Sequence, residues 1–151
     1  MKTTVKLAFG CDPNAQDLKT ILIREAESLG HEVVDYPSED PIYANVAIAV
    51  ATDVAAGEAD RGVLVCGTGI GVSIAANKVP GAYCACVADV YQAQRATLSN
   101  NANIIAMGSL VLGPETARLC LREYLAGTFD PGSRSGPKVD RIREYEGSAH
   151  A

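Results

Sequence analysis

At residues 63–71 the chain reads Val63-Leu64-Val65-Cys66-Gly67-Thr68-Gly69-Ile70-Gly71. An apolar run that suits a buried strand ends here in a turn with three alternating glycines, and a helical pattern follows from Val72. Alternating glycines allow consecutive backbone N–H groups to point into one concavity, where they can bind an anion or a developing oxyanion. The stretch therefore predicts a strand–turn–helix unit with Cys66 at the mouth of an anion site.

The same alternation of short apolar runs and longer helical patterns continues on both sides of this stretch. It predicts strands at Val5–Phe9, Glu32–Asp35, Gly62–Val65, Tyr83–Val87 and Asn103–Met107, and helices at Ala15–Leu29, Ile42–Ala56, Val72–Lys78, Val90–Leu98 and Pro114–Ala126. Strand–helix–strand connections are right-handed. The expected fold is therefore α/β, a single-domain doubly wound (Rossmann-like) five-stranded parallel sheet, whose ligand crevice lies outside the carboxyl ends of the strands.

Size and composition narrow the classes of partner. A chain of 151 residues fits one domain, and its net charge of −5 and 5% aromatic content argue against nucleic-acid binding. The longest apolar stretch, from Pro41 to Thr52, is too short to span a bilayer. Five cysteines, an odd number without a signal-peptide pattern, predict a reduced, cytoplasmic protein that binds neither nucleic acid nor membrane.

Two segments point to a second subunit. The helix predicted at Ile42–Ala56 carries no charge before Asp53 and is apolar on nearly every face, so we expect a partner chain to cover it. After a core of residues 1–126, residues 127–151 turn polar and read as an arm that reaches away from its own domain. Arg134, Lys138, Arg141 and Arg143 cluster in this arm and could hold a small anion.

Cys66 has no obvious histidine partner. A cysteine in an apolar strand is usually a core residue, but a thiol beside a helix N-terminus is more readily ionised. His31 opens the second strand, at the edge of the sheet opposite Cys66, and His150 lies in the terminal tail. Hydrolase chemistry of the Cys–His type therefore lacks its base. What remains is a thiolate that moves a proton next to a carbonyl, beside a backbone oxyanion hole.

Two other kinds of site are weighed and disfavoured. Gly67, Gly69 and Gly71 are one residue short of the dinucleotide spacing G-x-G-x-x-G, although Asp89 stands about where a ribose-binding acid would. We expect Asp89 to cap a helix, and Arg95 to face solvent or pair along the same helix. Cys84-x-Cys86 lacks the further ligands of a zinc site, so neither a metal nor a cofactor is expected.

The chain resembles the type B ribose-5-phosphate isomerases and their galactose-6-phosphate isomerase relatives over nearly its whole length. The resemblance is carried by Gly57-Glu58-Ala59-Asp60-Arg61-Gly62, by Cys66 to Gly71, by Ser73-Ile74-Ala75-Ala76-Asn77-Lys78, and by Gly10-Cys11-Asp12, Tyr43-Ala44, Asn100, Asn103 and Gly108-Ser109. It implies a sugar-phosphate substrate, and a homodimer or dimer of dimers with an active site shared between subunits.

The resemblance also implies roles for individual residues. Cys66 would move the proton between C1 and C2, assisted by Thr68, and the backbone N–H groups of Gly67, Gly69, Ile70 and Gly71 would hold the cis-enediolate. Asp12, Tyr43 and Asn100 would contact the sugar. Arg134 and Lys138 of the partner chain would hold the phosphate.

Several residues depart from the pattern of these isomerases. Pro13, Ala88 and Ser99 stand where histidines are typical, and the histidine at position 99 is the one associated with opening the furanose ring. Leu110 and Lys138 replace arginines. Proton transfer at Cys66 is thus retained while ring opening is not provided for, which favours a tetrose or tetrulose 4-phosphate, a sugar whose O4 is esterified and which must stay open.

Two alternatives stay open beside the tetrose. Ser99 or water could replace the missing histidine in an ordinary ribose 5-phosphate isomerase. The chain could also be a non-catalytic sugar-phosphate binding protein, although binding alone does not require Cys66; a nucleotide-binding domain is less favoured.

Overall fold

Five parallel strands form the centre of the molecule. The structure is a computed structural model that describes residues 4–149. The strands are β1 (Lys6–Cys11), β2 (Glu32–Asp35), β3 (Arg61–Cys66), β4 (Cys84–Cys86) and β5 (Ile104–Gly108), in the order β2-β1-β3-β5-β4. The predicted doubly wound parallel sheet is confirmed. β1 and β3 run on to Cys11 and Cys66, because Cys11 pairs with Val65 and Cys66 pairs with Gly108 beyond the predicted strand ends.

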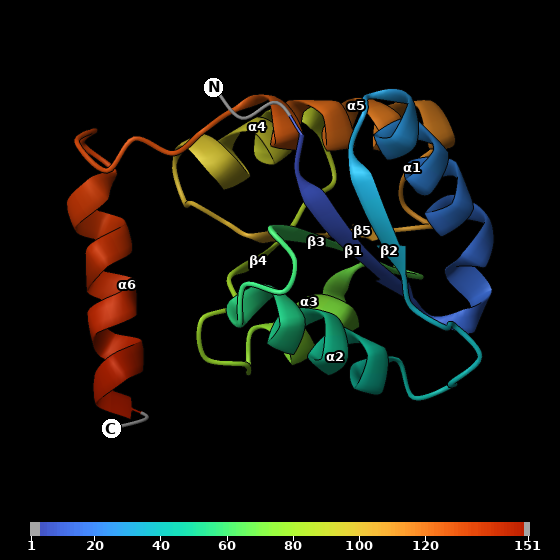
Figure 1. The fold of residues 1–151 in the computed structure, drawn as a ribbon, viewed down its shortest axis with the longest axis horizontal. Helices are drawn as coiled ribbons and strands as arrows, with labels where there is room; N and C mark the ends of the chain where they lie inside the picture. Colours follow the sequence, from blue (N-terminus) through green and yellow to red (C-terminus); the bar gives the residue numbers. More distant parts are fainter. Residues whose placement is uncertain (1–3, 150–151) are drawn as a thin grey trace.

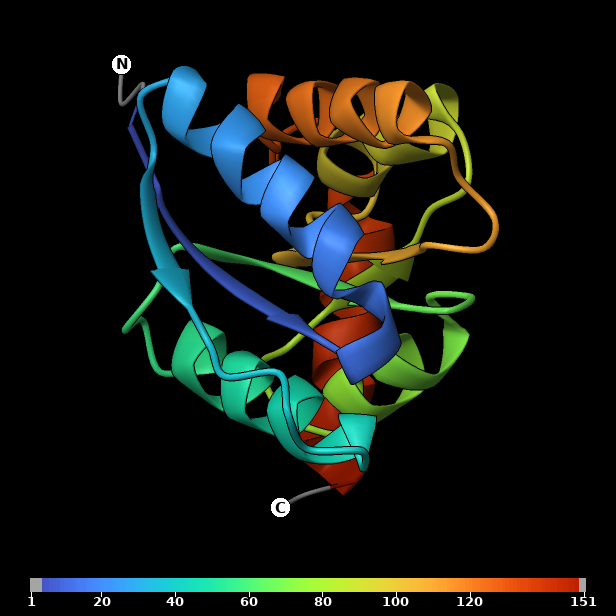
Figure 2. The same ribbon diagram turned by 90° about the vertical axis from the view of Figure 1, so that its right-hand side faces the viewer.

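Helices cover both faces of the sheet (Figures 1 and 2). A short 3-10 turn, η1 (Pro13–Ala15), leads into α1 (Gln16–Ser28), which shares one face with α4 (Val90–Leu98) and α5 (Pro114–Ala126). The other face carries α2 (Tyr43–Ala55) and α3 (Ile70–Ala76). Successive strand residues point to opposite faces, so Val65 belongs to the apolar core under α1 and α5, whereas Cys66 belongs to the core under α2.

The outer side of α2 is not covered by its own chain. Val46, Val50 and Val54 are buried against the sheet, whereas Ile42 and Ile48 are exposed. Ile70 and Ile74 of α3 are exposed as well. The expectation of a helix buried all round is therefore not met within one chain, and its cover by a second subunit stays a prediction. No helix within residues 4–149 is long and apolar enough to cross a membrane.

The C-terminal arm ends in a sixth helix, α6 (Gly136–Ala149), beside the β4 edge of the sheet (Figure 1). The Tyr83 hydroxyl donates a hydrogen bond to Glu146, and the Arg143 guanidinium lies 5.3 Å from the centre of the Tyr83 ring. The arm carries α6 to one side of its own domain (Figure 1), where its contacts with Tyr83 are ones that its composition does not reveal. Packing on a partner subunit remains a prediction.

Arg61 fixes the point where the arm leaves the domain. Its guanidinium donates to the carbonyl oxygens of Tyr124 (2.7 Å) and Gly127 (3.1 Å) and lies 4.9 Å from the centre of the Tyr124 ring. These bonds satisfy carbonyl groups at the C-terminus of α5, which a helix leaves without internal partners. The first residue of the arm is therefore held to the start of β3.

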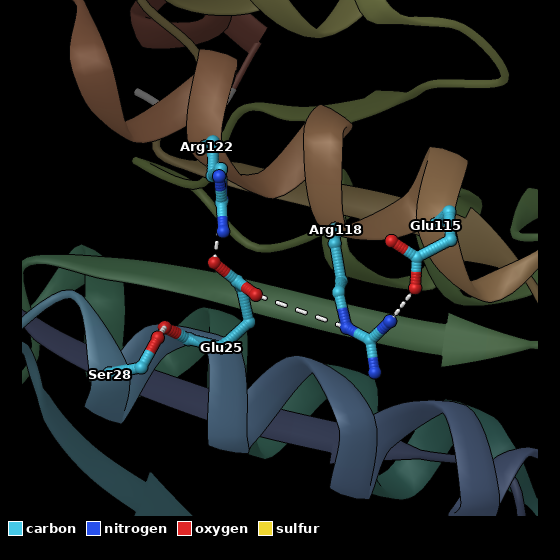
Figure 3. Close-up of polar contacts among 5 residues, drawn as sticks. All are labelled: Glu25, Ser28, Glu115, Arg118 and Arg122. Atoms are coloured by element: carbon cyan, nitrogen blue, oxygen red, sulfur yellow. Dashed lines mark hydrogen bonds and ion pairs between the residues drawn. The ribbon is translucent and has the colours of Figure 1, made fainter.

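A second charged contact joins α5 to α1 (Figure 3). Glu25 of α1 is only 8% exposed and pairs with Arg122 (2.6 Å) and Arg118 (3.9 Å) of α5. Glu115 binds Arg118 from the other side, one turn along α5 (Figure 3). This cluster links the two helices over the face of the sheet that does not carry Cys66.

Candidate active site

The Cys66 thiol lies at the carboxyl end of β3 with a backbone donor aimed at it. Cys66 is 6% exposed, and the Gly69 N–H donates to its Sγ over 3.1 Å. Gly69 has a φ of 80°, and a Cβ there would lie 2.9 Å from the carbonyl carbon of Met107. Only glycine fits this turn without strain. The Gly69 N–H is therefore a fixed hydrogen-bond donor for a negative charge on the sulfur.

The turn also satisfies part of its own hydrogen bonding. The Thr68 Oγ1 accepts from the Ile70 N–H over 3.2 Å. Because the amides of Gly69 and Ile70 are engaged by Cys66 and Thr68, they are not free donors for a substrate in this state. Neither residue lines the pocket at Cys66, and the Ile70 side chain is exposed.

A cavity of about 340 Å³ opens in front of the thiol, and we call it the cysteine pocket. It is lined by Asp12, Asn14, Tyr43, Cys66, Gly67, Thr68, Gly71, Ser109 and Leu110. Most of these residues follow β1, β3 or β5, whose carboxyl ends meet at one edge of the sheet. The crevice is thus where a doubly wound sheet is expected to bind its ligand.

Asp12 combines a structural contact with a place in the cysteine pocket. Its Oδ2 accepts from the Asn14 N–H over 2.9 Å and caps η1. Its carboxylate side chain also lines the cavity that contains the thiol. The cap orients the carboxylate, so the two roles are compatible.

The Tyr43 ring packs directly against Gly71 in the cysteine pocket, where any side chain at position 71 would collide with it. A Cβ at Gly71 would lie 2.4 Å from Cζ and Oη of Tyr43. We expect Gly71→Ala to displace the Tyr43 ring and to lower kcat/KM by roughly tenfold or more, as misplaced binding groups do. Gly71 lies in the first turn of α3, where alanine is the better helix former, so urea unfolding should show a stability change within about 1 kcal/mol.

Gly147→Ala is the matched control for this substitution. A Cβ at Gly147 in α6 would meet no described atom within 4 Å apart from its chain neighbours and the backbone of its own helix. Its kcat/KM should stay at the wild-type value in the same assay. Unchanged kcat/KM in a folded Gly71→Ala variant would remove Tyr43 from the site.

A second cavity, of about 470 Å³, lies between α4 and the arm, and we call it the basic pocket. It is lined by Tyr91, Arg95, Ser99, Asn100, Arg134, Ser135, Lys138, Val139 and Ile142. Pro137 falls in the first turn of α6, where proline is tolerated. Arg134 lies in the turn before this helix and Lys138 lies within it, and both line the same cavity. Three cations and no carboxylate line this pocket, which suits it to an anion.

The two pockets share no residue, and the fold places them at different edges of the sheet. α4 begins beyond the carboxyl end of β4 and returns over nine residues, about 13 Å. Ser99 and Asn100 therefore lie near the amino ends of the strands, close to Asn103, which bonds Gly81 and Tyr83 just before β4. Within one chain the structure does not bring Ser99, Asn100, Arg134 or Lys138 to Cys66.

Residues weighed as alternatives have structural roles. His31 accepts from the Val5 N–H over 3.2 Å at the amino edge of the sheet, and burial lowers the pKa of its imidazole. Asp89 caps α4 by accepting from the Gln92 N–H over 2.7 Å, as expected. All five cysteines are unpaired. His150 lies outside the described residues.

The pockets contain residues that sequence reasoning did not assign to them. Asn14, Ser109 and Leu110 line the cysteine pocket, and Leu110 is 86% exposed at its rim, against Gly67. Tyr91, Arg95 and Ser135 line the basic pocket. Arg95 could have been found from its spacing, since it precedes Ser99 by four residues on one helix face.

A doubly wound sheet with a thiol at its carboxyl edge and a separate cation-lined pocket defines an α/β protein suited to small anionic molecules. A family model described as ribose/galactose isomerase matches residues 7–142. The chain belongs to the ribose/galactose isomerase family. The resemblance found in its motifs is confirmed, and so is its class, a sugar-phosphate aldose–ketose isomerase.

Individual relatives agree with this assignment. The chain is 54% identical over 106 residues to D-erythrulose-4-phosphate isomerase 2 of Mycolicibacterium smegmatis, covering 70% of each chain. It is 43% identical over 146 residues to D-erythrulose-4-phosphate isomerase of Pectobacterium atrosepticum, covering 94% of this chain and 95% of that one. The solved type B ribose 5-phosphate isomerase of Trypanosoma cruzi superposes with a TM-score of 0.91 at 34% identity, covering 98% and 99% of the two chains.

Proposed function

We propose that this chain interconverts a tetrulose 4-phosphate, such as erythrulose 4-phosphate, and the corresponding aldose 4-phosphate. The observation that carries the proposal is the replacement of the expected ring-opening histidine by Ser99, together with the absence of any imidazole from the lining of either pocket within residues 4–149. A pentose 5-phosphate closes a furanose through O4, whereas a tetrose 4-phosphate has that oxygen esterified. The two relatives named D-erythrulose-4-phosphate isomerases support the choice of the tetrose.

In the proposed reaction the Cys66 thiolate acts as the base. It removes a proton from C1 of the ketose to form a cis-enediolate. The proton exchanges with solvent while it is on the sulfur, and the thiol then delivers a proton to C2 to give the aldose. The Gly69 N–H donates a hydrogen bond to Sγ, the atom that takes up the proton. Thr68 and Asp12, which line the same pocket, would carry the second proton between O1 and O2. Tyr43 and the backbone of Gly67 and Gly71 would surround the enediolate.

We also propose that the complete site forms between two chains. The cysteine pocket of one chain would face the basic pocket of its partner, which would supply Asn100, Arg134 and Lys138. The separation of the two pockets within one chain supports this arrangement. The exposed isoleucines of α2 and α3 offer an apolar face for the contact. The assembly would be a homodimer or a dimer of dimers in the cytoplasm.

An NMR assay in D2O tests the reaction and its substrate. Erythrulose 4-phosphate, ribose 5-phosphate and allose 6-phosphate are offered separately to the wild-type protein. We expect kcat/KM for the tetrulose to exceed that for the pentose by roughly a hundredfold, the range that one missing acid–base group costs in ring opening. Deuterium should enter at the carbon next to the carbonyl.

Two other results would overturn the proposal. A clear preference for ribose 5-phosphate would mean that Ser99 or water opens the ring and that the enzyme is a pentose isomerase. Tight binding of a sugar phosphate without deuterium exchange on any of the three sugars would favour a binding protein.

A further inference from the structure

Arg95 contacts the residue that replaces the expected histidine. Its Nε–H donates to Ser99 Oγ over 2.7 Å, and both side chains line the basic pocket. We infer that Arg95 is a third phosphate-binding cation and that its bond to Ser99 makes this hydroxyl a phosphate donor rather than a proton-transferring group. The inference rests on the proposed function, because it assigns the phosphate end of the proposed substrate to this pocket.

The direction of the hydrogen bond decides the role of Ser99. A guanidinium carries only donors, so the Ser99 oxygen must be the acceptor. One lone pair of that oxygen is then occupied beside a permanent positive charge, which makes it a poor base. The hydroxyl hydrogen is not used in this bond, so Ser99 can still donate it to another acceptor.

The charges of the pocket are not neutralised by the protein. Arg95, Arg134 and Lys138 make no ion pair with any residue in the described range 4–149, and the lining contains no carboxylate. Arg95 uses Nε for Ser99, so the N–H groups on its two terminal nitrogens remain for a ligand. Planar guanidinium groups bind phosphate oxygens two at a time.

The hydroxyls complete the anion site. Ser99 and Ser135 line the cavity along with the three cations. A phosphate dianion in a space of about 470 Å³ would therefore meet positive charge from α4 and from the arm together. Arg95 thus adds a phosphate contact to this pocket, and it does not replace the histidine in ring opening.

Arg95→Gln and Ser99→Ala in the full-length protein test this assignment. We measure inorganic phosphate binding by calorimetric titration, and KM and kcat with erythrulose 4-phosphate. Arg95→Gln should weaken phosphate binding and raise KM together by roughly ten- to a hundredfold, the size of a charge-assisted hydrogen bond. Its kcat should stay within about threefold, since the reacting carbons lie at Cys66. Ser99→Ala should change the same two quantities by a smaller factor, and Arg95→Lys should recover part of the loss.

Arg141→Gln is the matched control. This substitution also removes one positive charge. Arg141 belongs to the basic cluster of the arm, but the structure pairs it with Glu144 and leaves it outside the basic pocket, so it is not part of the anion site. Its phosphate affinity should change by less than about twofold, as expected for a screened surface charge.

Three outcomes distinguish this inference from the proposed function. Unchanged phosphate affinity in a folded Arg95→Gln variant would overturn the binding role of Arg95. A large loss of kcat at constant KM in Ser99→Ala would show that Ser99 transfers protons. Phosphate binding that depends on Arg95 in a protein without isomerase activity would support the anion site and refute the proposed reaction, because the titration needs no turnover.

Discussion

Replacing Cys66 with alanine should lower kcat on erythrulose 4-phosphate by about 10³-fold or more and abolish deuterium exchange next to the carbonyl. The variant removes the one thiol in the cysteine pocket, and the sulfur that accepts from the Gly69 N–H. Cys66→Ser should be nearly as inactive, because a serine hydroxyl holds its proton far more tightly than a thiol does at neutral pH. Substrate consumption and isotope entry are followed in the same NMR sample.

Cys120→Ala provides the control for losing a buried cysteine. Cys120 is buried in the apolar core under α5, and burial raises the pKa of its thiol to about 11, so it stays protonated at neutral pH. Its replacement should lower the free energy of unfolding by roughly 1 kcal/mol without changing kcat. Proton exchange by Cys66→Ala within tenfold of the wild-type rate would show that another group is the base.

Mixing two inactive variants should restore activity if the site is shared between chains. Cys66→Ala damages the cysteine pocket, and Arg134→Gln damages the basic pocket. In an equal mixture of exchanged subunits half of the dimers pair one chain of each kind, and each such dimer carries one intact composite site. About a quarter of the wild-type activity should return, from a background of about 1% or less for either variant alone at low substrate.

A mixture of Cys66→Ala with Tyr43→Phe serves as the control. Both substitutions lie in the cysteine pocket, so no mixed dimer contains an intact one. Activity should then stay at the average of the two separate variants. Native mass spectrometry confirms that mixed dimers have formed. If mixed dimers of Cys66→Ala and Arg134→Gln form and no activity returns, the two pockets do not combine across subunits.

Half of the candidate site follows from sequence alone because of a general property of parallel sheets. Their strands all end at the same edge, so the residues after β1 and β3 must meet there. Asp12, Cys66 and Thr68 could be grouped on this basis, and the structure places them in one cavity. Gly69 and Ile70 could not be judged this way, because the direction of each N–H depends on the local turn.

The sequence by itself determined the succession of strands and helices along the chain, the glycine turn and the thiol at the mouth of that turn. These features depend on local periodicity, on the backbone freedom of glycine and on the handedness of crossovers, all of which act over short distances along the chain. The tertiary structure alone decided that Ser99 and Arg134 lie away from Cys66, that α6 contacts Tyr83, and that Arg95 binds Ser99 inside a cation-lined cavity. Such contacts depend on how far α4 returns across the sheet and on where the arm packs, and no short-range pattern specifies either.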